Sequence, residues 1–141
     1  MTITVNWFVL YVRTASEERV LKNLLNHLQV DIYTPFIPKK AWPYIKKDSV
    51  YREDKICFPG YVFIQSKKSV DESIEELKTT IYGIKEAYYF LFYGSDKRDI
   101  ALRDNERICL EHLMNTGFYI ESSIGFIEGD YVKVVSGALL T

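Results

Sequence analysis

The sequence predicts an α+β fold in which one antiparallel sheet packs against helices. The chain has 141 residues, of which 48% are hydrophobic and 26% charged, a composition typical of a globular domain that can bury a sizeable core. β-prone runs alternate with amphipathic segments in the order strand, helix, strand, strand, helix, strand, helix. Glycine and proline separate several of these segments, as expected of turns.

The first predicted strand, residues 7–12, is apolar on both of its alternating faces, which favours a central position in the sheet. Thr14 and Glu17 then have the spacing of a helix capping box. We expect a helix from about Ser16 to Gln29 with one apolar stripe against a core. The stripe consists of Val20, Leu21, Leu24, Leu25 and Leu28.

Residues 32–37 predict a second strand, and Pro35 within it indicates an edge strand or a bulge. Residues 39–55 are polar and basic, and we expect them to form a long hairpin arm or a mobile loop. The third strand of the sheet is predicted within residues 56–65. Pro59-Gly60 interrupts this segment with a turn signal.

A second capping box, formed by Ser69 and Glu72, predicts the start of the second helix, which Gly83 ends. The apolar residues of this helix recur at helical spacing. They are Val70, Ile74, Leu77 and Ile81.

The aromatic segment 84–93 predicts a fourth strand, and residues 94–96 a turn. Asp104 is the expected N-cap of a third helix that runs to about Asn115. Its predicted apolar residues are Ile108, Leu110, Leu113 and Met114. The core of the fold therefore has four strands and three helices.

The chain divides into three parts by its turn and helix signals. Residues 1–117 predict one domain, residues 118–127 a linker, and residues 128–141 the beginning of a second, apparently truncated β domain. A short strand is expected at residues 131–135, without further strands to pair with it.

The net charge is −1, so a positive field over the whole protein is excluded. Residues 39–55, however, contain six basic and three acidic residues with aromatic residues among them, a pattern that suits a local contact with nucleic acid. The candidate contacts in the arm are Lys39, Lys40, Lys46 and Lys47. A second candidate patch, at the first strand–helix junction, consists of Arg13, Arg19 and Lys22. The alternative for the arm is a solvated hairpin that binds nothing.

The sequence has no nucleophile motif, phosphate-binding loop, dinucleotide fingerprint or zinc-ligand spacing. We therefore predict a binding protein rather than an enzyme, with no catalytic residues, cofactor or metal. Cys57 and Cys109 are expected to be reduced, buried thiols. No signal peptide and no bilayer-spanning apolar run are visible, which predicts a cytoplasmic protein without a membrane partner.

Four segments that follow one another along the chain carry a family resemblance. They are the strand W-F-V-L-Y-V at 7–12 with the helix after it, F-P-G-Y-V-F-I at 58–64, Gly83-Ile84 with the aromatic strand and Gly94, and G-D-Y-V-K-V at 129–134. This order resembles the NusG-type transcription factors, whose most distinctive motif is F-P-G-Y-V-x-V. The last segment resembles the start of the KOW domain of that family.

The resemblance implies an N-terminal NusG domain, with a four-stranded antiparallel sheet flanked by helices, followed by a KOW-type domain. It implies a factor, expected to be monomeric, that promotes processive elongation by binding RNA polymerase. In the family, an apolar patch receives the clamp helices of the largest polymerase subunit. Carried over to this sequence, the patch comprises Tyr11, Tyr61, Phe63, Phe90 and Tyr93. Residues near the family's gate-loop contact are Lys78, Thr79 and Thr80.

The opening strand and the segment I-G-F-I-E-G-D look closer to specialised paralogues of the LoaP and UpxY type. Those relatives are operon-specific antiterminators, which implies recognition of an RNA hairpin or an exposed single strand. The alternative function is a ribosome-associated or free RNA-binding protein that uses a KOW-type module. Exposure of Tyr61 and Phe63 favours polymerase binding, because a protein that only binds RNA is expected to bury them.

Overall fold

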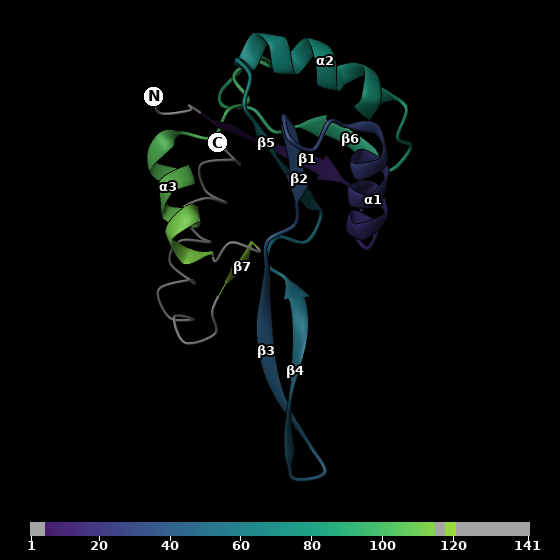
Figure 1. The fold of residues 1–141 in the computed structure, drawn as a ribbon, viewed down its shortest axis with the longest axis vertical. Coiled ribbons are helices and arrows are strands. Elements are labelled where there is room, and N and C mark those ends of the chain that lie inside the picture. The colour runs from purple at the N-terminus through teal and green to yellow at the C-terminus, as the bar shows by residue number, and fades with distance from the viewer. Residues whose placement is uncertain (1–4, 115–117, 121–141) are drawn as a thin grey trace.

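The structure, a computed structural model, describes residues 5–114 and 118–120 (Figure 1). Helices and strands follow the predicted alternation, with a projecting hairpin inserted between the second and third strands of the main sheet. The elements are β1 (Asn6–Val12), α1 (Glu17–His27), β2 (Tyr33–Phe36), β3 (Lys39–Lys46), β4 (Ser49–Ile56), β5 (Tyr61–Ser66), α2 (Val70–Tyr82), β6 (Ala87–Phe90), α3 (Asp104–Leu113) and β7 (Tyr119–Ile120).

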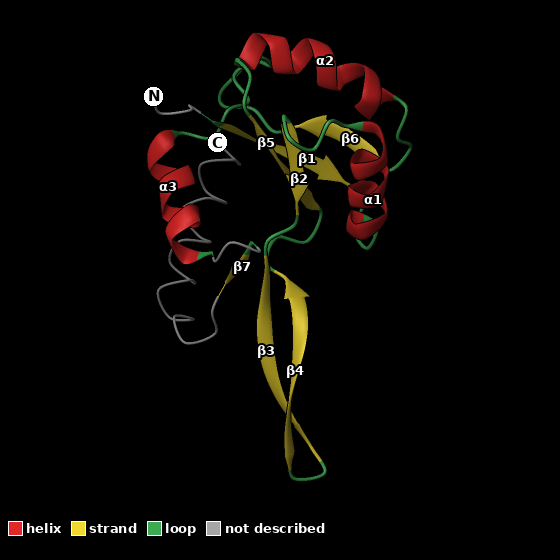
Figure 2. Cartoon of the chain, in the orientation of Figure 1, coloured by secondary structure: helices red, strands yellow, loops and turns green. Residues whose placement is uncertain are grey.

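The main sheet has four antiparallel strands in the order β2-β5-β1-β6, which confirms the predicted fold class (Figure 2). β1 lies between β5 and β6, as expected for a strand that is apolar on both faces. β2 is an edge strand. Pro35 has no backbone N–H to donate, and an edge strand tolerates this because it has a neighbouring strand on one side only. The predicted fourth strand is shorter than expected, because only residues 87–90 pair as β6.

The two faces of the sheet bury separate clusters of side chains. Phe8, Leu10 and Val12 of β1 join Val20 and Leu24 of α1 in a cluster that also includes residues of α2. The alternate residues of β1 face the other way and pack against α3. That second cluster contains Trp7, Val9, Phe36, Phe58, Phe63, Leu102, Leu110, Leu113 and Met114. The sheet is thus covered by α1 and α2 on one face and by α3 on part of the other.

The basic segment forms a two-stranded arm, β3 and β4, that projects from the body of the domain (Figure 1). This confirms the expected hairpin. Lys47 and Asp48 make its tight turn with φ values of 52° and 64°, the left-handed conformation that a two-residue hairpin loop requires. β7 pairs in parallel with the base of β3, through Lys39 and Lys40, and completes a second sheet in the order β4-β3-β7.

Two of the predicted helix starts are wrong in detail. Ser16 is the N-cap of α1 and makes no side-chain capping bond, so Thr14 and Glu17 do not form a capping box. Glu17 is instead only 3% exposed and accepts a hydrogen bond of 2.8 Å from the backbone N–H of Gly60. The Glu17 carboxylate therefore binds the Pro59-Gly60 turn through this contact and does not cap the helix. Similarly, Asp104 is the first residue of α3 and not its cap.

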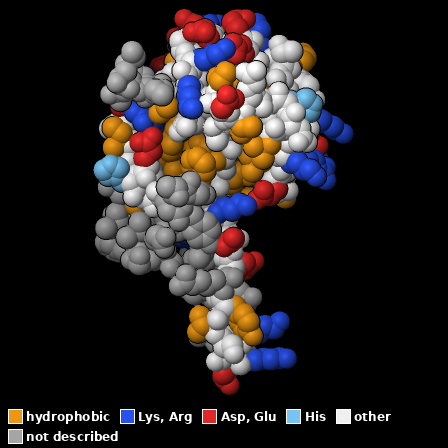
Figure 3. Space-filling view, in the orientation of Figure 1, with side chains coloured by type: hydrophobic (Ala, Val, Ile, Leu, Met, Phe, Trp, Pro, Cys, Tyr) orange, Lys and Arg blue, Asp and Glu red, His pale blue; other side chains and the backbone are white. Residues whose placement is uncertain are grey.

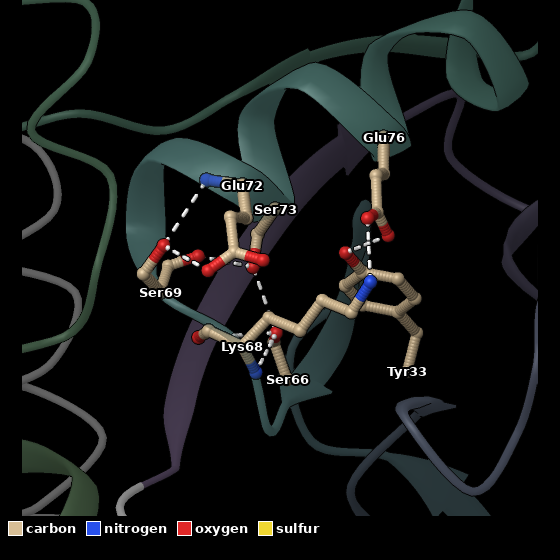
Figure 4. Close-up of polar contacts among 7 residues, drawn as sticks. All are labelled: Tyr33, Ser66, Lys68, Ser69, Glu72, Ser73 and Glu76. Carbon is tan, nitrogen blue, oxygen red and sulfur yellow. Dashed lines mark hydrogen bonds and ion pairs between the residues drawn. The ribbon is translucent and has the colours of Figure 1, made fainter.

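The capping box of α2 is confirmed (Figure 4). The Ser69 hydroxyl accepts a hydrogen bond from the Glu72 backbone N–H at 3.2 Å and donates to the Glu72 carboxylate at 3.0 Å. Next to it, the buried Ser66 and Ser73 hydroxyls lie 2.7 Å apart and join β5 to α2.

Farther along α2, the Glu76 carboxylate accepts hydrogen bonds from the Tyr33 hydroxyl and the Lys68 amine (Figure 4). These contacts fix α2 against β2 and the end of β5.

We expect the domain to lose stability at alkaline pH through two tyrosines. Burial, assisted by the bond to Glu76, raises the pKa of Tyr33 to about 12, and burial raises the pKa of Tyr93 to about 12. Unfolded tyrosines ionise near pH 10, so this stabilisation is complete below about pH 10 and is lost as the pH rises to about 12. Chemical denaturation across this range should show the free energy of unfolding falling, and falling less in a Tyr33→Phe/Tyr93→Phe variant.

The control is Tyr82→Phe, which removes a hydroxyl from a side chain that is 95% exposed. This control should leave the alkaline decline unchanged. An equal decline in the wild type and the double variant would contradict the prediction.

Other predictions fall partly or wholly outside the described residues. Cys57 and Cys109 are free, as expected, but they are half-buried rather than buried. Of the predicted apolar residues of α3, Ile108 is 43% exposed. The predicted helix end at Asn115, the linker beyond residue 120 and the KOW-like segment 128–141 lie outside the described residues. In the described part, no helix is both long and apolar enough to cross a membrane.

Candidate interaction surface

Three neighbouring strands place a tyrosine at the same level of the sheet. Tyr11 of β1 pairs with Tyr61 of β5 on one side and with Tyr89 of β6 on the other. The ring centroid of Tyr11 lies 5.8 Å from that of Tyr61 and 5.4 Å from that of Tyr89. Tyr88 also contacts Tyr11, at 5.2 Å. We call these four residues, Tyr11, Tyr61, Tyr88 and Tyr89, the tyrosine surface.

A bulge explains why two consecutive residues of β6 contact Tyr11. The register passes from Tyr11 opposite Tyr89 to Val12 opposite Ala87, so Tyr88 is the extra residue. A bulge sets two residues of one strand against one residue of its partner and interrupts the alternation of side chains. This local irregularity brings Tyr88 and Tyr89 together beside β1.

The surface is open because α3 covers only part of this face of the sheet. Along β1, Trp7 and Val9 are each 1% exposed beneath the α3 cluster, whereas Tyr11, two residues farther on, is only half-buried. Tyr88 and Tyr89 are 50% and 53% exposed. Figure 3 shows hydrophobic side chains gathered over the body of the domain, above the projecting arm.

The tyrosine surface is suited to binding another protein. Tyrosine buries a large apolar ring and keeps a hydroxyl for a polar contact, and such residues are enriched at interface centres. None of the four hydroxyls donates a hydrogen bond to another described residue, so they are available to a partner. The tight ring packing also limits the entropy that binding would cost.

The five residues of the predicted patch do not lie together on one surface. Phe63 is fully buried, with its ring 5.4 Å from that of Phe58 and 5.5 Å from that of Phe36, because it lies under α3 on the covered part of this face. Phe90 packs on the opposite face, with its ring 5.9 Å from that of Phe8. Only Tyr11 and Tyr61 of the predicted set belong to the tyrosine surface.

Tyr93 has a structural role. Its hydroxyl donates a hydrogen bond of 2.9 Å to Glu106 and accepts one from the Arg103 backbone N–H. The Arg103 guanidinium lies 3.9 Å from the centre of the Tyr93 ring and is itself held by Asp99 at 2.8 Å. These contacts tie the loop after β6 to α3 and satisfy the hydroxyl internally.

The four candidate lysines of the arm occupy two different places. Lys39 and Lys40 are half-buried at its base, and Lys39 forms an ion pair with Glu18. Lys46 and Lys47 are exposed at its tip, next to Val50, which is 72% exposed. Of the four candidates, Lys46 and Lys47 at the tip are therefore the ones accessible to a polyanion.

The second basic patch lies at the start of α1. Arg13, Arg19 and Lys22 are all exposed. Arg19 forms a long ion pair of 3.7 Å with Glu86, and the Arg13 backbone N–H bonds to the Glu86 carbonyl at 2.8 Å. These contacts bring the segment before β6, including the exposed Lys85, next to the patch, which the sequence alone did not indicate.

The three predicted gate-loop residues lie on the last turns of α2. Lys78 and Thr79 are exposed and Thr80 is half-buried. Lys78 forms an ion pair of 2.8 Å with Glu75, which lowers the pKa of that carboxylate. They share one accessible helix end, and Lys78 lines the same groove as Tyr88 and Tyr89 of the tyrosine surface.

No chemistry of a catalytic centre emerges from the described residues. Within residues 5–114 and 118–120, no group of three His, Cys, Asp or Glu side chains is placed to hold a metal ion. The side chains whose pKa is shifted take part in ion pairs and hydrogen bonds that hold elements together, as in the contacts of Lys68 with Glu76 and Arg98 with Asp71.

Comparison with known proteins gives the following matches. A family model described as transcription termination factor nusG matches residues 5–110. The transcription termination/antitermination protein NusG of Thermus thermophilus is 26% identical over an alignment of 149 positions, which covers 96% of this chain and 77% of that protein. A solved structure titled domain interaction in Thermotoga maritima NusG has a TM-score of 0.48 and 18% identity, covering 73% of this chain and 53% of that one. The chain thus spans about half the length of that solved protein.

Proposed function

The chain belongs to the NusG family of transcription termination and antitermination factors, and on that premise we propose that it binds RNA polymerase through the tyrosine surface to control elongation. The proposed contact is with the clamp helices of the largest polymerase subunit. The family match at residues 5–110 includes every strand that contributes to this surface.

The exposed row of tyrosines is the observation that carries the proposal. Cross-strand pairing gives Tyr11, Tyr61 and Tyr89 a common level on three strands, with half-exposed rings. Helices dock on such surfaces by placing apolar side chains between aromatic rings, while hydroxyls bond to polar groups at the rim. The exposed Lys78 and Thr79 at the end of α2 are proposed as a second, smaller contact, with the polymerase gate loop.

The alternative is an RNA-binding protein that acts without polymerase. The buried Phe63 fits this alternative, but the exposed Tyr88 and Tyr89 favour a protein partner. The deciding experiment is a pull-down of purified RNA polymerase with the full chain. Retention of polymerase at physiological salt supports the proposal. Binding of structured RNA with no retention of polymerase would favour the alternative.

We further propose that the arm contacts nucleic acid at its tip. Lys46 and Lys47 are exposed at the tip of the projecting arm. Because the net charge of the chain is near zero, only these local positive charges attract the phosphates of nucleic acid. The affinity of the chain for nucleic acid should therefore be low unless polymerase holds the chain and the nucleic acid close together. A role restricted to particular operons, as in the LoaP and UpxY type, would follow from such a contact with an RNA hairpin or exposed single strand.

Replacing Lys46 by glutamate should reduce terminator read-through while polymerase binding stays normal. Each lost phosphate contact should lower the salt slope of binding to single-stranded nucleic acid by about 0.7. Read-through in a purified transcription assay, beside the polymerase pull-down, measures both effects. The matched control is Lys67→Glu, which makes the same charge change at another exposed lysine just after β5.

Equal read-through by the wild type and Lys46→Glu would exclude the tip as the contact. Lys22→Glu then tests the patch at the start of α1.

A further inference from the structure

A groove runs between α2 and the edge strand β6, on the side of the sheet that the two N-terminal helices cover. One part has a volume of about 470 Å³ and is lined by Ile74, Tyr89, Phe90, Phe92 and Ile100, with Lys97 at its rim. A second part of about 390 Å³ shares Ile74, Tyr89 and Phe90 and continues toward the end of α2. Because the two parts share three residues, they form one continuous surface.

One wall of the groove is a ridge of α2. Ile74, Lys78 and Tyr82 follow one another at intervals of four residues and so project from the same side of the helix. Tyr82 is 95% exposed, an unusual state for a large aromatic side chain. From Ile74 to Tyr82 the ridge is about 12 Å long at 1.5 Å per residue, which corresponds to roughly two helical turns.

The rim of the groove is positively charged. Lys85 and Lys97 are exposed and form no ion pair with any residue that the structure describes. The Glu75 carboxylate of α2 is already paired with Lys78 at 2.8 Å and with Arg98 at 3.9 Å. The charged residues that line the two described parts of the groove are all lysines, namely Lys78, Lys85 and Lys97, although the chain as a whole carries a net charge of −1.

We propose that this groove binds an acidic amphipathic helix of a partner protein. Apolar side chains of that helix would occupy the space between Ile74, Phe90 and Phe92, and its carboxylates would meet Lys85 and Lys97. A ridge of regularly spaced side chains favours a helical occupant, because ridges of one helix pack into the grooves of another.

An added β-strand fits the groove less well. β6 has four residues, and the N–H of Leu91 already bonds to Val9 of β1. So short an edge offers little pairing to a second strand.

The proposal goes beyond polymerase binding and is testable apart from it. Tyr88 and Tyr89 line both the groove and the tyrosine surface, and Lys78, the proposed gate-loop contact, lies on the groove wall. Tyr11 and Tyr61, however, do not line the groove, and Lys85 and Lys97 belong to neither proposed polymerase contact. Variants of the two surfaces therefore separate the two activities. The groove variant is Lys85→Glu/Lys97→Glu, and its matched control is Lys55→Glu/Lys67→Glu, with the same charge change at two exposed lysines elsewhere.

The probe is a fluorescent synthetic peptide with leucines on one helical face and glutamates on the other, measured by fluorescence anisotropy with the full chain. We expect it to bind the wild type and the control variant equally, and the groove variant at least tenfold more weakly. A peptide with lysines in place of the glutamates should also bind the wild type at least tenfold more weakly. Equal binding to all three proteins, or no binding to the wild type at millimolar peptide, would overturn the proposal.

Two further experiments test whether the occupant is a helix and whether the groove is distinct from the polymerase contact. A peptide with proline at its centre cannot form a continuous helix, so undiminished binding of that peptide would overturn the helical occupant. The groove variant should retain RNA polymerase in the pull-down as the wild type does. Loss of polymerase from that variant would show that the groove belongs to the polymerase contact and would overturn a separate partner.

Discussion

Replacing Tyr11 and Tyr61 together by alanine is expected to weaken RNA polymerase binding by about 2 kcal/mol or more, the scale of interface hot spots. This corresponds to roughly a 30-fold rise in Kd. The two rings lie 5.8 Å apart at the centre of the tyrosine surface, and Tyr11 also contacts Tyr88 and Tyr89, so their removal leaves the other two without support. Titration of purified polymerase against the labelled variant measures the change.

The matched control for this variant is Ile108→Ala on α3. Ile108 is 43% exposed and lies outside the tyrosine surface, so its truncation should leave polymerase binding unchanged. Because Tyr11 and Tyr61 are half-buried, circular dichroism and a denaturation curve should establish that the double variant is folded. A folded double variant with wild-type affinity for polymerase would remove the tyrosine surface from the proposed function.

Replacing Phe63 by alanine should destabilise the domain by about 3–5 kcal/mol, the usual cost of truncating a buried phenylalanine. Its side chain is fully buried between β5 and α3, and its ring contacts those of Phe36, Phe58 and Trp7 at centroid distances of 5.5, 5.4 and 6.4 Å. The truncation leaves a cavity that these three rigid rings cannot readily fill. Urea denaturation followed by tryptophan fluorescence measures the loss.

Two variants separate the stability effect from a binding effect. Phe63→Leu keeps most of the buried volume and should lose clearly less stability than Phe63→Ala. Tyr89→Ala removes a ring that is 53% exposed and should change stability far less. If Phe63→Ala is as stable as the wild type and binds polymerase more weakly, then Phe63 is accessible in solution and the assignment to the core is wrong.

Much of the fold was predictable because local sequence and tertiary structure agree. Residues 7–12 are apolar on both faces and form the strand that has neighbours on both sides. Ser69 and Glu72 have the capping-box spacing and make the capping bonds. The basic segment 39–55 forms a hairpin, although its turn residues Lys47 and Asp48 are not those that sequence rules favour at positive φ.

Where local signals compete with long-range contacts, the predictions failed. Glu17 has the spacing of a capping residue, but its carboxylate accepts a hydrogen bond from the backbone N–H of Gly60, which is 43 positions away in sequence. Phe63 shares a strand face with Tyr61, so their sequence positions gave no way to distinguish them. The end of α3 covers Phe63 and leaves Tyr61 half-exposed.

The order of elements, the α+β class and the family are predictable from the sequence, because periodicity, turn residues and a few motifs are local properties of the chain. Only the tertiary structure decided which aromatic residues form a surface. That outcome depends on the bulge at Tyr88, which sets two tyrosines beside Tyr11, and on how far α3 extends over the sheet. Strand register and helix placement are set by contacts between distant segments, and these contacts divide chemically similar tyrosines and phenylalanines into core and surface.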